Sequence, residues 1–292
     1  MNDERRVTDY DRIADRFDAR YARYAYDGVR ETLLNFLGPQ PSAVLEVGCG
    51  TGHWLAVAHE ARLKPSPHDD ERSAKAVAER LAERPILAGV DPSAPMLAHA
   101  ASRRATASPR PGSGQAAERI HLVRARAEDL PWRDATFDRV FAVNALHHFA
   151  DRSRFFAEAR RVLKPGGGLL TVGKDPHTDR DEWWIYQYFE ETRAIDLQRF
   201  ARVRTLRGEM ALAGFAWTES MEAEHIEVLR RAGDALADGI VDRSFTSELA
   251  MLSDEEFKSG VERVRQANDA AGGELQLVAD VRLYATIGWV GP

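Results

Sequence analysis

The sequence predicts an α/β fold in which a doubly wound, mostly parallel sheet carries an added helical, aromatic cap. Short buried runs bounded by glycine or polar residues recur through the first two thirds of the chain. Stretches with apolar residues at intervals of three and four positions separate these runs, and that interval is the helical period. Strands that alternate with helices in this order indicate a parallel sheet covered on both faces.

The composition allows one large domain and argues against several classes of protein. The chain has 292 residues, of which 44% are hydrophobic and 29% charged, so it is neither disordered nor collagenous. Its formal net charge is -6, so no overall attraction draws it to nucleic acid or to an anionic membrane. Cys49 is the single cysteine, which excludes an intrachain disulfide and a cysteine-rich zinc site.

The charged start of the chain has no leader-like apolar stretch, and no run of about 20 apolar residues occurs anywhere. We therefore expect a cytoplasmic protein without a membrane or nucleic-acid partner. The sequence does not indicate the oligomeric state.

The predicted elements follow in order from a helical N-terminal stretch. Apolar residues at helical spacing run from Tyr10 to Leu37, and Gly38 ends this stretch. Five short buried runs then predict strands, at residues 43–47, 86–90, 120–124, 139–143 and 169–172. Two polar segments interrupt the rhythm and are predicted to be insertions, near residues 64–84 and 106–119.

The last third of the chain has a different character. An aromatic segment at residues 183–189 leads into further helix. Residues 225–229 predict a strand, Ser253–Glu256 forms a capping box that begins a helix, and apolar residues alternate from Asp280 to Trp289. We expect this region to form the cap and to close the sheet.

The sharpest local signal is a glycine turn directly after the first buried strand, at Gly48, Gly50 and Gly52. Glycines there permit positive φ angles and let a ligand approach the backbone, and the helix that follows begins with free N–H groups. Binding of a dinucleotide needs G-x-G-x-x-G, but His53 occupies the third glycine position. The turn therefore predicts a small-molecule crevice and disfavours a nicotinamide cofactor.

Five motifs follow one another between residues 44 and 172: VLEVGCGTG at 44–52, GVDPSAPML at 89–97, AEDLPW at 127–132, FDRV with NALHHF at 137–149, and LKPGGG at 163–168. In this order they resemble the class I S-adenosylmethionine (SAM)-dependent methyltransferases, especially the small-molecule branch that contains the ubiquinone/menaquinone-biosynthesis enzymes. The resemblance implies a Rossmann-like domain with a mostly parallel, seven-stranded sheet and an antiparallel C-terminal strand.

The resemblance also divides the chain, residues 1–292, which we expect to form a single domain. An N-terminal helical lid is expected at 1–40 and a SAM-binding core at 41–174. The cap and acceptor region would follow at 175–224. Strands and a helix at 225–292 would complete the sheet.

By the same resemblance, residues at the ends of successive strands would bind SAM. Glu46 and the glycine loop would hold its methionine part, Asp91 would accept hydrogen bonds from both ribose hydroxyls, and Pro92 with Met96 would flank the adenine. The full set of implied cofactor residues is Glu46, Gly48, Cys49, Gly50, Thr51, Gly52, Asp91, Pro92, Met96, Ala127, Glu128, Val143 and Asn144.

Two positions depart from the family pattern. Asp69 and Asp70 lie nearer than Asp91 to the usual spacing from Glu46, but the proline-rich residues before them cannot form a buried strand. Arg126 stands where the family commonly has an acceptor for the adenine amino group. Because arginine only donates, Glu128 or Asp129 would have to replace it.

The acceptor side is less defined by the sequence. His147, His148 and His177 are candidate bases, needed only if the acceptor is protonated at neutral pH. They have no further ligands at metal-binding spacing, so no metal is expected. Five aromatic residues are candidate walls of the acceptor pocket: Trp183, Trp184, Tyr186, Tyr10 and Tyr21. Those of the segment after the fifth strand could equally anchor a cap helix, and the N-terminal stripe with Tyr10 and Tyr21 is more often core.

Three arginines in the following helices, Arg193, Arg199 and Arg202, could hold an acidic acceptor or simply be solvated. The sequence thus predicts a SAM-dependent methyltransferase that transfers a methyl group in line to a small-molecule acceptor. The alternative from another class is a catalytically inactive SAM-binding regulatory or scaffold protein.

Overall fold

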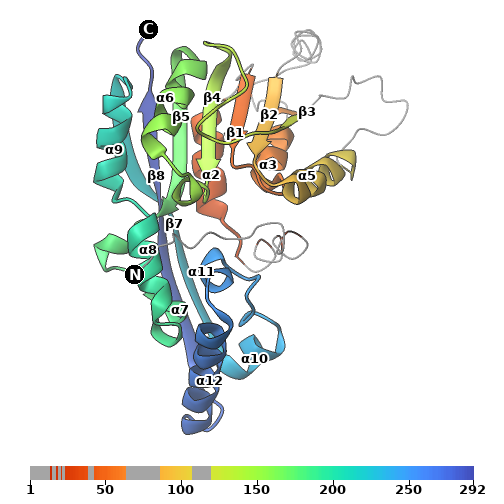
Figure 1. Ribbon diagram of the computed structural model, residues 1–292, viewed down its shortest axis with the longest axis vertical. Coiled ribbons are helices and arrows are strands. Elements are labelled where there is room, and N and C mark those ends of the chain that lie inside the picture. Colours follow the sequence, from red (N-terminus) through yellow and green to blue (C-terminus); the bar gives the residue numbers. More distant parts are fainter. Residues whose placement is uncertain are drawn as a thin grey trace, which may run out of the picture.

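The computed structural model describes residues 24–38, 43–63, 86–106 and 120–292, together with Ala14, Asp18 and Tyr21. A mixed sheet forms its centre, with strand order β3-β2-β1-β4-β5-β8-β6 and with β7 paired to β8 (Figure 1). The strands are β1 (Ala43–Val47), β2 (Ile86–Asp91), β3 (Ile120–Arg124), β4 (Phe137–Val143), β5 (Leu163–Lys174), β6 (Glu182–Trp183), β7 (Trp217–Arg231) and β8 (Gln276–Trp289). Tyr10 and almost all of the two predicted insertions lie outside the described residues.

The five predicted parallel strands are confirmed as β1 to β5. All five residues of β1 are buried, and β1 lies between β2 and β4 with parallel pairing on both sides. The strands β3 and β5 extend the parallel sheet beyond β2 and β4. Because the carboxyl ends of parallel strands share one edge, the segments that follow these strands gather there.

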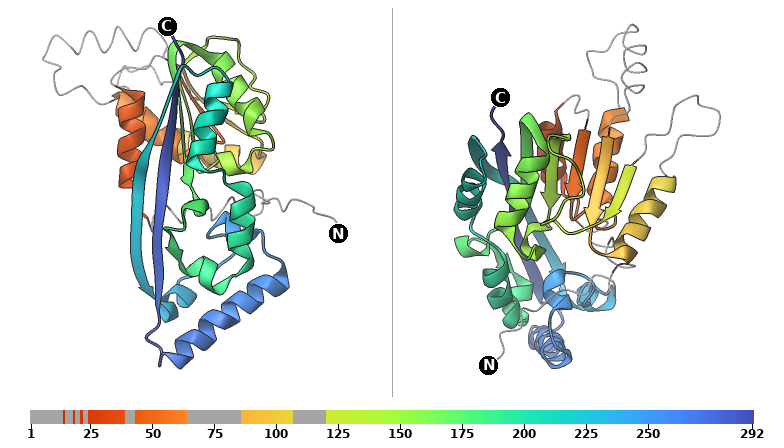
Figure 2. Two further views of the ribbon diagram at one scale, coloured as in Figure 1. Left: turned by 90° about the vertical axis from the view of Figure 1, so that its left-hand side faces the viewer. Right: turned by 45° about the horizontal axis from the view of Figure 1, so that its top comes forward.

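The antiparallel part of the sheet is longer than predicted. The strands β7 and β8 pair along their whole length, from Trp217 with Trp289 to Arg231 with Gln276, whereas β5 reaches only the second half of β8. The part of this β7–β8 ribbon that contains the end of β7 and the start of β8 therefore projects past the parallel strands, with β6 on its edge (Figure 2). The sheet has eight strands where seven were predicted, and the stretch 225–229 is only the middle of β7.

Helices cover both faces of the parallel part (Figure 2). Helices α2 (Asp27–Leu37), α3 (His53–Leu63) and α5 (Ala94–Thr106) lie on one face, and α6 (Arg152–Val162) and α9 (Val203–Leu212) on the other. The N-terminus of α2 has no side-chain cap from Tyr26. Instead the carboxylate of Glu224, on β7, accepts hydrogen bonds from the N–H groups of Gly28 and Val29 at 2.6 and 3.2 Å.

A second lobe surrounds the projecting ribbon (Figure 1). It consists of α7 (Trp184–Tyr188), α8 (Glu191–Arg199), α10 (Ala232–Ala237), α11 (Ser247–Ala250) and α12 (Asp254–Ala270). The predicted aromatic segment supplies much of its separate core, through Trp184, Ile185, Tyr188 and Phe189. The predicted capping box at Ser253 is present, with both reciprocal hydrogen bonds to Glu256.

Among the described helices, none has the length and apolar character needed to cross a membrane. The cytoplasmic location stays a prediction.

Candidate cofactor and acceptor site

The glycine turn has a backbone that side chains would disturb. Gly48, Gly50 and Gly52 have φ angles of 73°, 50° and 77°, in the region that favours glycine. A Cβ on Gly48 would lie 2.6 Å from the Cβ of Ala145, and one on Gly52 would lie 3.0 Å from the Cβ of Ala100. The turn is therefore held by close packing against two neighbouring segments.

Asp91, the last residue of β2, ties two loops of the strand-end edge together. One carboxylate oxygen accepts from the N–H of Gly50 at 2.9 Å, and the other accepts from the N–H of Ser93 at 2.9 Å. The Asp91 side chain therefore joins the glycine turn to the residue that precedes α5.

Glu46, the fourth of the five residues of the buried β1, is an ionisable group in an apolar setting. It is 1% exposed, and burial raises its pKa well above the ordinary value even though the N–H of Leu55 bonds to it. Among the residues described, no donor meets its Oε2 atom. A buried carboxylate in this state gains stability from a cation or a second donor.

Cys49 does not fit a catalytic role. Its thiol is buried, and burial, with the nearby Glu46 and Asp91 carboxylates, raises its pKa well above the ordinary value. A thiol of this kind stays protonated and is a poor nucleophile.

Thr51 faces an acidic residue of the N-terminal segment. Its hydroxyl donates to Asp18 at 2.5 Å, and Arg103 of α5 pairs with the same carboxylate while donating to the Thr51 carbonyl at 3.3 Å. Asp18 and Arg103 are thus two residues beside the glycine turn that the sequence motifs did not single out.

At the place where the resemblance puts adenine, a residue of the second lobe packs against α5. Met96 is buried, whereas Pro92 is exposed, and Met96 packs with Ala14 and with Ala250 of α11. The second lobe therefore reaches the α5 residue that the resemblance places next to adenine. Sequence reasoning missed Ala250 because an alanine late in the chain carries no motif.

Glu128 forms hydrogen bonds with the loop that precedes α6. Its carboxylate accepts from the N–H groups of Ala150 and Asp151 at 2.7 and 3.2 Å, which fixes the loop before α6. Arg126 also contacts it at 3.4 Å. Ala127, which lies between Arg126 and Glu128 in the chain, is buried.

Val143 and Asn144 stand at the end of β4. Val143 is buried, and Asn144 has a φ angle of 51° and donates its backbone N–H to the carbonyl of Val172 at 2.8 Å. The following residues Leu146–His148 form a short 3-10 helix. The ends of β4 and β5 are therefore locked side by side.

A small cavity, which we call the strand-end cavity, opens beside this junction. It includes one predicted histidine, His147, whose ring stacks on Phe200 with centroids 4.0 Å apart. Its other walls come from β5, β8 and the segment around the α8–α9 connection. The lining residues are Leu146, His147, Arg152, Thr171, Val172, Gly173, Lys174, Arg199, Phe200, Ala201, Val203, Leu206 and Tyr284.

One wall of the strand-end cavity is a buried ion cluster, formed by Lys174, Asp196, Arg199 and Glu248. The Nζ atom of Lys174 lies 2.7 Å from Asp196 and 2.9 Å from Glu248, and Arg199 lies 2.7 Å from Asp196. Tyr186 donates its hydroxyl to Asp196 at 2.7 Å. All four charged side chains are at most 11% exposed, so two cations and two anions balance inside the protein.

The pKa shifts favour the charged forms of Lys174 and Glu248, whereas burial and the nearby Glu248 raise the pKa of Asp196. Burial alone would lower the pKa of Lys174, but the carboxylates of Asp196 and Glu248 outweigh it and hold that pKa well above its ordinary value. Burial would raise the pKa of Glu248, but Lys174 and Arg199 hold it below its usual range. Of the three arginines considered from sequence, Arg199 alone belongs to this cluster, and no predicted pattern signalled Lys174.

The other two predicted histidines are placed differently from His147. His177 lies in the 3-10 helix Pro176–Thr178, and its Nε2 is 2.8 Å from the carbonyl of Phe200. His148 is half-buried beside His147, with ring centroids 3.9 Å apart. Neither His148 nor His177 lines the strand-end cavity.

The predicted aromatic residues divide between two places. Tyr21 stacks on His53 at the start of α3, with centroids 3.6 Å apart, next to the glycine turn. Trp183 and Tyr186 lie over the Lys174 ammonium, at 4.1 and 5.3 Å from it. Trp184 is buried in the core of the second lobe.

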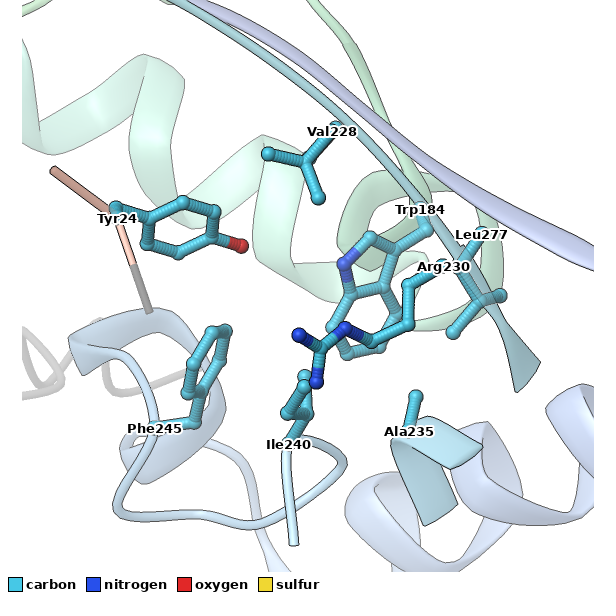
Figure 3. Close-up of a pocket in the computed structure, with 9 residues that line it drawn as sticks. Tyr24, Trp184, Val228, Arg230, Ala235, Ile240, Phe245 and Leu277 are labelled. Carbon is cyan, nitrogen blue, oxygen red and sulfur yellow. The ribbon is translucent and has the colours of Figure 1, made fainter. Parts of the chain in front are cut away.

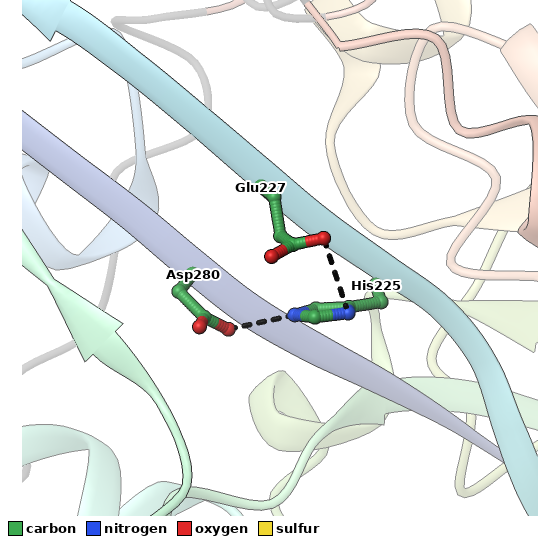
Figure 4. A group of neighbouring side chains, drawn as sticks. All are labelled: His225, Glu227 and Asp280. Atoms are coloured by element: carbon green, nitrogen blue, oxygen red, sulfur yellow. Dashed lines mark hydrogen bonds and ion pairs between the residues drawn. The ribbon is translucent and has the colours of Figure 1, made fainter.

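A further group of potential metal ligands lies on the ribbon (Figure 4). The ring of His225 is 2.8 Å from Asp280 and 3.7 Å from Glu227. The guanidinium of Arg282 is also 2.8 Å from Asp280. This cation already neutralises the carboxylate that a metal ion would need.

Comparison with known proteins agrees with this geometry. Residues 71–171 match the family described as "Methyltransferase domain". A ubiquinone/menaquinone biosynthesis C-methyltransferase from Acidiphilium cryptum is 34% identical over 136 residues, covering 36% of this chain and 52% of the relative. A malonyl-[acyl-carrier protein] O-methyltransferase from Geobacter sulfurreducens is 34% identical over 171 residues, covering 57% of this chain and 52% of the relative.

Among solved structures, a candidate methyltransferase from an antibiotic biosynthesis pathway in Anabaena variabilis has a TM-score of 0.59 at 18% identity, with 88% of this chain and 96% of that chain covered. The chain spans about half or less of the length of the first curated relatives it matches, from 24% to 52%. The fold is that of Rossmann-like methyltransferases, and the matched residues are similar to class I SAM-dependent methyltransferases. Its matched relatives are methyltransferases of small molecules and of a carrier-bound acyl group.

Proposed function

We propose that the protein is an active SAM-dependent methyltransferase that methylates a small molecule held in the strand-end cavity. The observation that carries this proposal is the buried Oε2 of Glu46, which meets no donor among the described residues and lies beside a glycine turn that the Asp91 carboxylate holds. SAM offers an ammonium group, which would supply that donor, and ribose hydroxyls, which Asp91 could bind. The residues present thus fit this cofactor.

Glu46 and the Gly48–Gly52 turn would hold the methionine part, Asp91 the ribose, and Met96 the adenine. Met96 gains its position from Ala250, so the second lobe also shapes the cofactor side. Thr51 is already bonded to Asp18, and Glu128 to the loop before α6. In this proposal these two residues support the site without a direct contact to the cofactor.

When bound, SAM supplies a methyl group on a positively charged sulfur, which is a good electrophile. The contribution of this chain is to hold the acceptor in line with that group and to exclude water. The rigid junction of Asn144 with Val172 and the stacked His147–Phe200 pair suit this positioning role. If the acceptor carries a proton at neutral pH, His147 is placed to accept it, because it alone of the three predicted histidines lines the cavity.

Two measurements test the proposal. Calorimetric titration with SAM and with its demethylated product should give dissociation constants in the micromolar range or below, and absence of binding to both refutes it. Incubation with labelled-methyl SAM and a metabolite extract, followed by mass spectrometry, should reveal a labelled small molecule. Binding without labelling of any small molecule would instead support the inactive SAM-binding protein.

The role of His147 has its own test, with His148 as the matched control. Once an acceptor is found, His147→Asn should lower kcat and remove the acidic limb of the pH–rate profile if it accepts the proton. His148→Asn should leave the profile in place. Equal loss in the two variants would show that the pair acts only through packing.

A further inference from the structure

Strand β7 lies at one edge of the sheet. It pairs with β8 along its length, and among the described strands β8 is its sole partner. Figure 2 shows β7 along the outer margin of the second lobe, with the helices of that lobe on the other side of the ribbon. Within the described part of the chain, the backbone groups of β7 that point away from β8 therefore form an edge onto which another strand can pair.

The N-terminus of α2 covers this edge in the middle of β7. A Cβ on Gly28 would lie 2.2 Å from the carbonyl oxygen of Ala223, and Glu224 accepts from the N–H of Gly28 at 2.6 Å. A register shift between Glu222 and Glu224 also bends the strand there. The last part of β7, residues 225–231, lies beyond this contact, and we call it the terminal edge.

The outer face of the terminal edge carries an acid, a leucine and a base. Alternate residues of a strand point to opposite faces, and Val228 and Arg230 point inward, where they line a small pocket of the second lobe (Figure 3). Glu227, Leu229 and Arg231 therefore point outward. Leu229 is 69% exposed, and the side chains of Glu227 and Arg231 are 71% and 55% exposed.

This pattern is complementary to itself. When the terminal edges of two copies pair antiparallel about a two-fold axis through Leu229, Leu229 faces its equivalent and Glu227 faces Arg231 of the second copy. A shift of two residues in either direction would place Arg231 opposite His225 or Leu229 and lose both ion pairs. Charged residues on an edge usually prevent pairing, but this order of charges favours one register between two copies.

The neighbours of these charges within the chain compete only weakly with a second copy. On β8, Asp280 lies opposite Glu227 in the register, and like charges in that position destabilise a sheet. His225 is 3.7 Å from Glu227. Arg231 pairs with Glu274 at 2.8 Å, but both side chains are more than half exposed, so water and salt screen this pair.

We propose that the protein forms a two-fold dimer by antiparallel pairing of the terminal edges, which joins the ribbons of two copies into one sheet. Because only residues 227–231 of each copy face each other, the contact is small and the dimer is weak, with a Kd of about 10–500 µM. None of these residues lines the strand-end cavity. Each copy therefore keeps its own site, and this inference does not depend on methyl transfer.

Sedimentation velocity of the full chain, from about 5 to about 500 µM, measures the association. The wild type should change from monomer to dimer across this range. Sodium chloride at about 1 M should raise the Kd, because the ion pairs are exposed. A protein that stays monomeric at every concentration overturns the proposal. A separate titration with SAM tests only the proposed methyltransferase activity.

Exchange of the two charges locates the contact. Glu227→Arg and Arg231→Glu each place like charges opposite one another, and each should raise the Kd about tenfold or more. The double variant Glu227→Arg, Arg231→Glu restores opposite charges and should recover the dimer, which misfolding would not produce. Glu219→Arg, the matched control on β7 outside the terminal edge, should leave the Kd unchanged. Equal effects of the Glu219 and Glu227 variants, or no recovery in the double variant, would contradict the assignment.

Discussion

Removing the Lys174 ammonium should destabilise the protein far more than removing a surface lysine. In Lys174→Met the ion cluster changes from two cations and two anions to one cation and two anions. Asp196 and Glu248 are 0% and 6% exposed, so water cannot replace the lost partner. Arg199 remains 2.7 Å from Asp196 but 3.6 Å from Glu248, which leaves Glu248 the poorer compensated of the two.

The size of the effect follows from this burial. Breaking a buried ion pair by removing one partner costs about 3–5 kcal/mol, because an uncompensated buried charge remains. The methionine thioether preserves most of the side-chain volume, so little of this cost is due to a cavity. For a chain of this size the loss corresponds to a decrease in Tm of roughly 6–20 °C.

Urea unfolding followed by circular dichroism at pH 7.5 measures the effect. Lys164→Met is the matched control, because Lys164 also pairs with a carboxylate, Asp138 at 2.9 Å, but is 36% exposed. It should cost less than about 1 kcal/mol. The double variant Lys174→Met, Glu248→Gln restores a neutral cluster and should recover part of the stability. Equal costs for the two lysine variants, or no recovery in the double variant, would refute the charge-balance argument.

Three further predictions follow from single sites. Glu46→Gln should weaken SAM binding about tenfold or more in calorimetry. It should not lower the urea midpoint, because burial raises the pKa of Glu46 and so already favours the neutral side chain that glutamine resembles. A loss of stability in this variant would contradict the prediction. Gly48→Ala should cost about 1–3 kcal/mol and more than Gly38→Ala, since only the first meets Ala145, while a Cβ on Gly38 enters open space. Glu248 has a folded pKa below its unfolded value. Its contribution to the free energy of unfolding should therefore be full above about pH 4.3 and be lost at lower pH. The unfolding midpoint of Glu248→Gln should then change less with acid than that of the wild type.

The sequence predicted the cofactor half of the molecule because its residues act locally. Each parallel strand is a short buried run, and the candidate site residues lie at or directly after its end, as Asp91 lies at the end of β2. The antiparallel strand β7 was harder to predict. Most of its residues are half-exposed or exposed, so it lacks the regular apolar alternation from which its full length could be predicted.

The strand-end cavity and the second lobe depend on contacts between distant parts of the chain. Lys174 meets Asp196 and Glu248, which lie 22 and 74 residues further along the chain, and Met96 meets Ala250. None of these pairs has a local pattern, and the buried Lys174 resembles an ordinary strand-ending lysine in the sequence. The aromatic segment 183–189 contributes to the core of the second lobe, but whether its rings line a ligand site could not be decided from residue type alone.

Strand β8 belongs to both parts of the molecule. Its second half pairs with β5 beside the strand-end cavity, and its first half packs in the core of the second lobe through Leu277 and Ala279. The same strand therefore contributes Tyr284 to the strand-end cavity and apolar side chains to the second lobe. Because β7 pairs with β8 through both parts, with one register shift between Glu222 and Glu224, backbone hydrogen bonds join the second lobe to the central sheet.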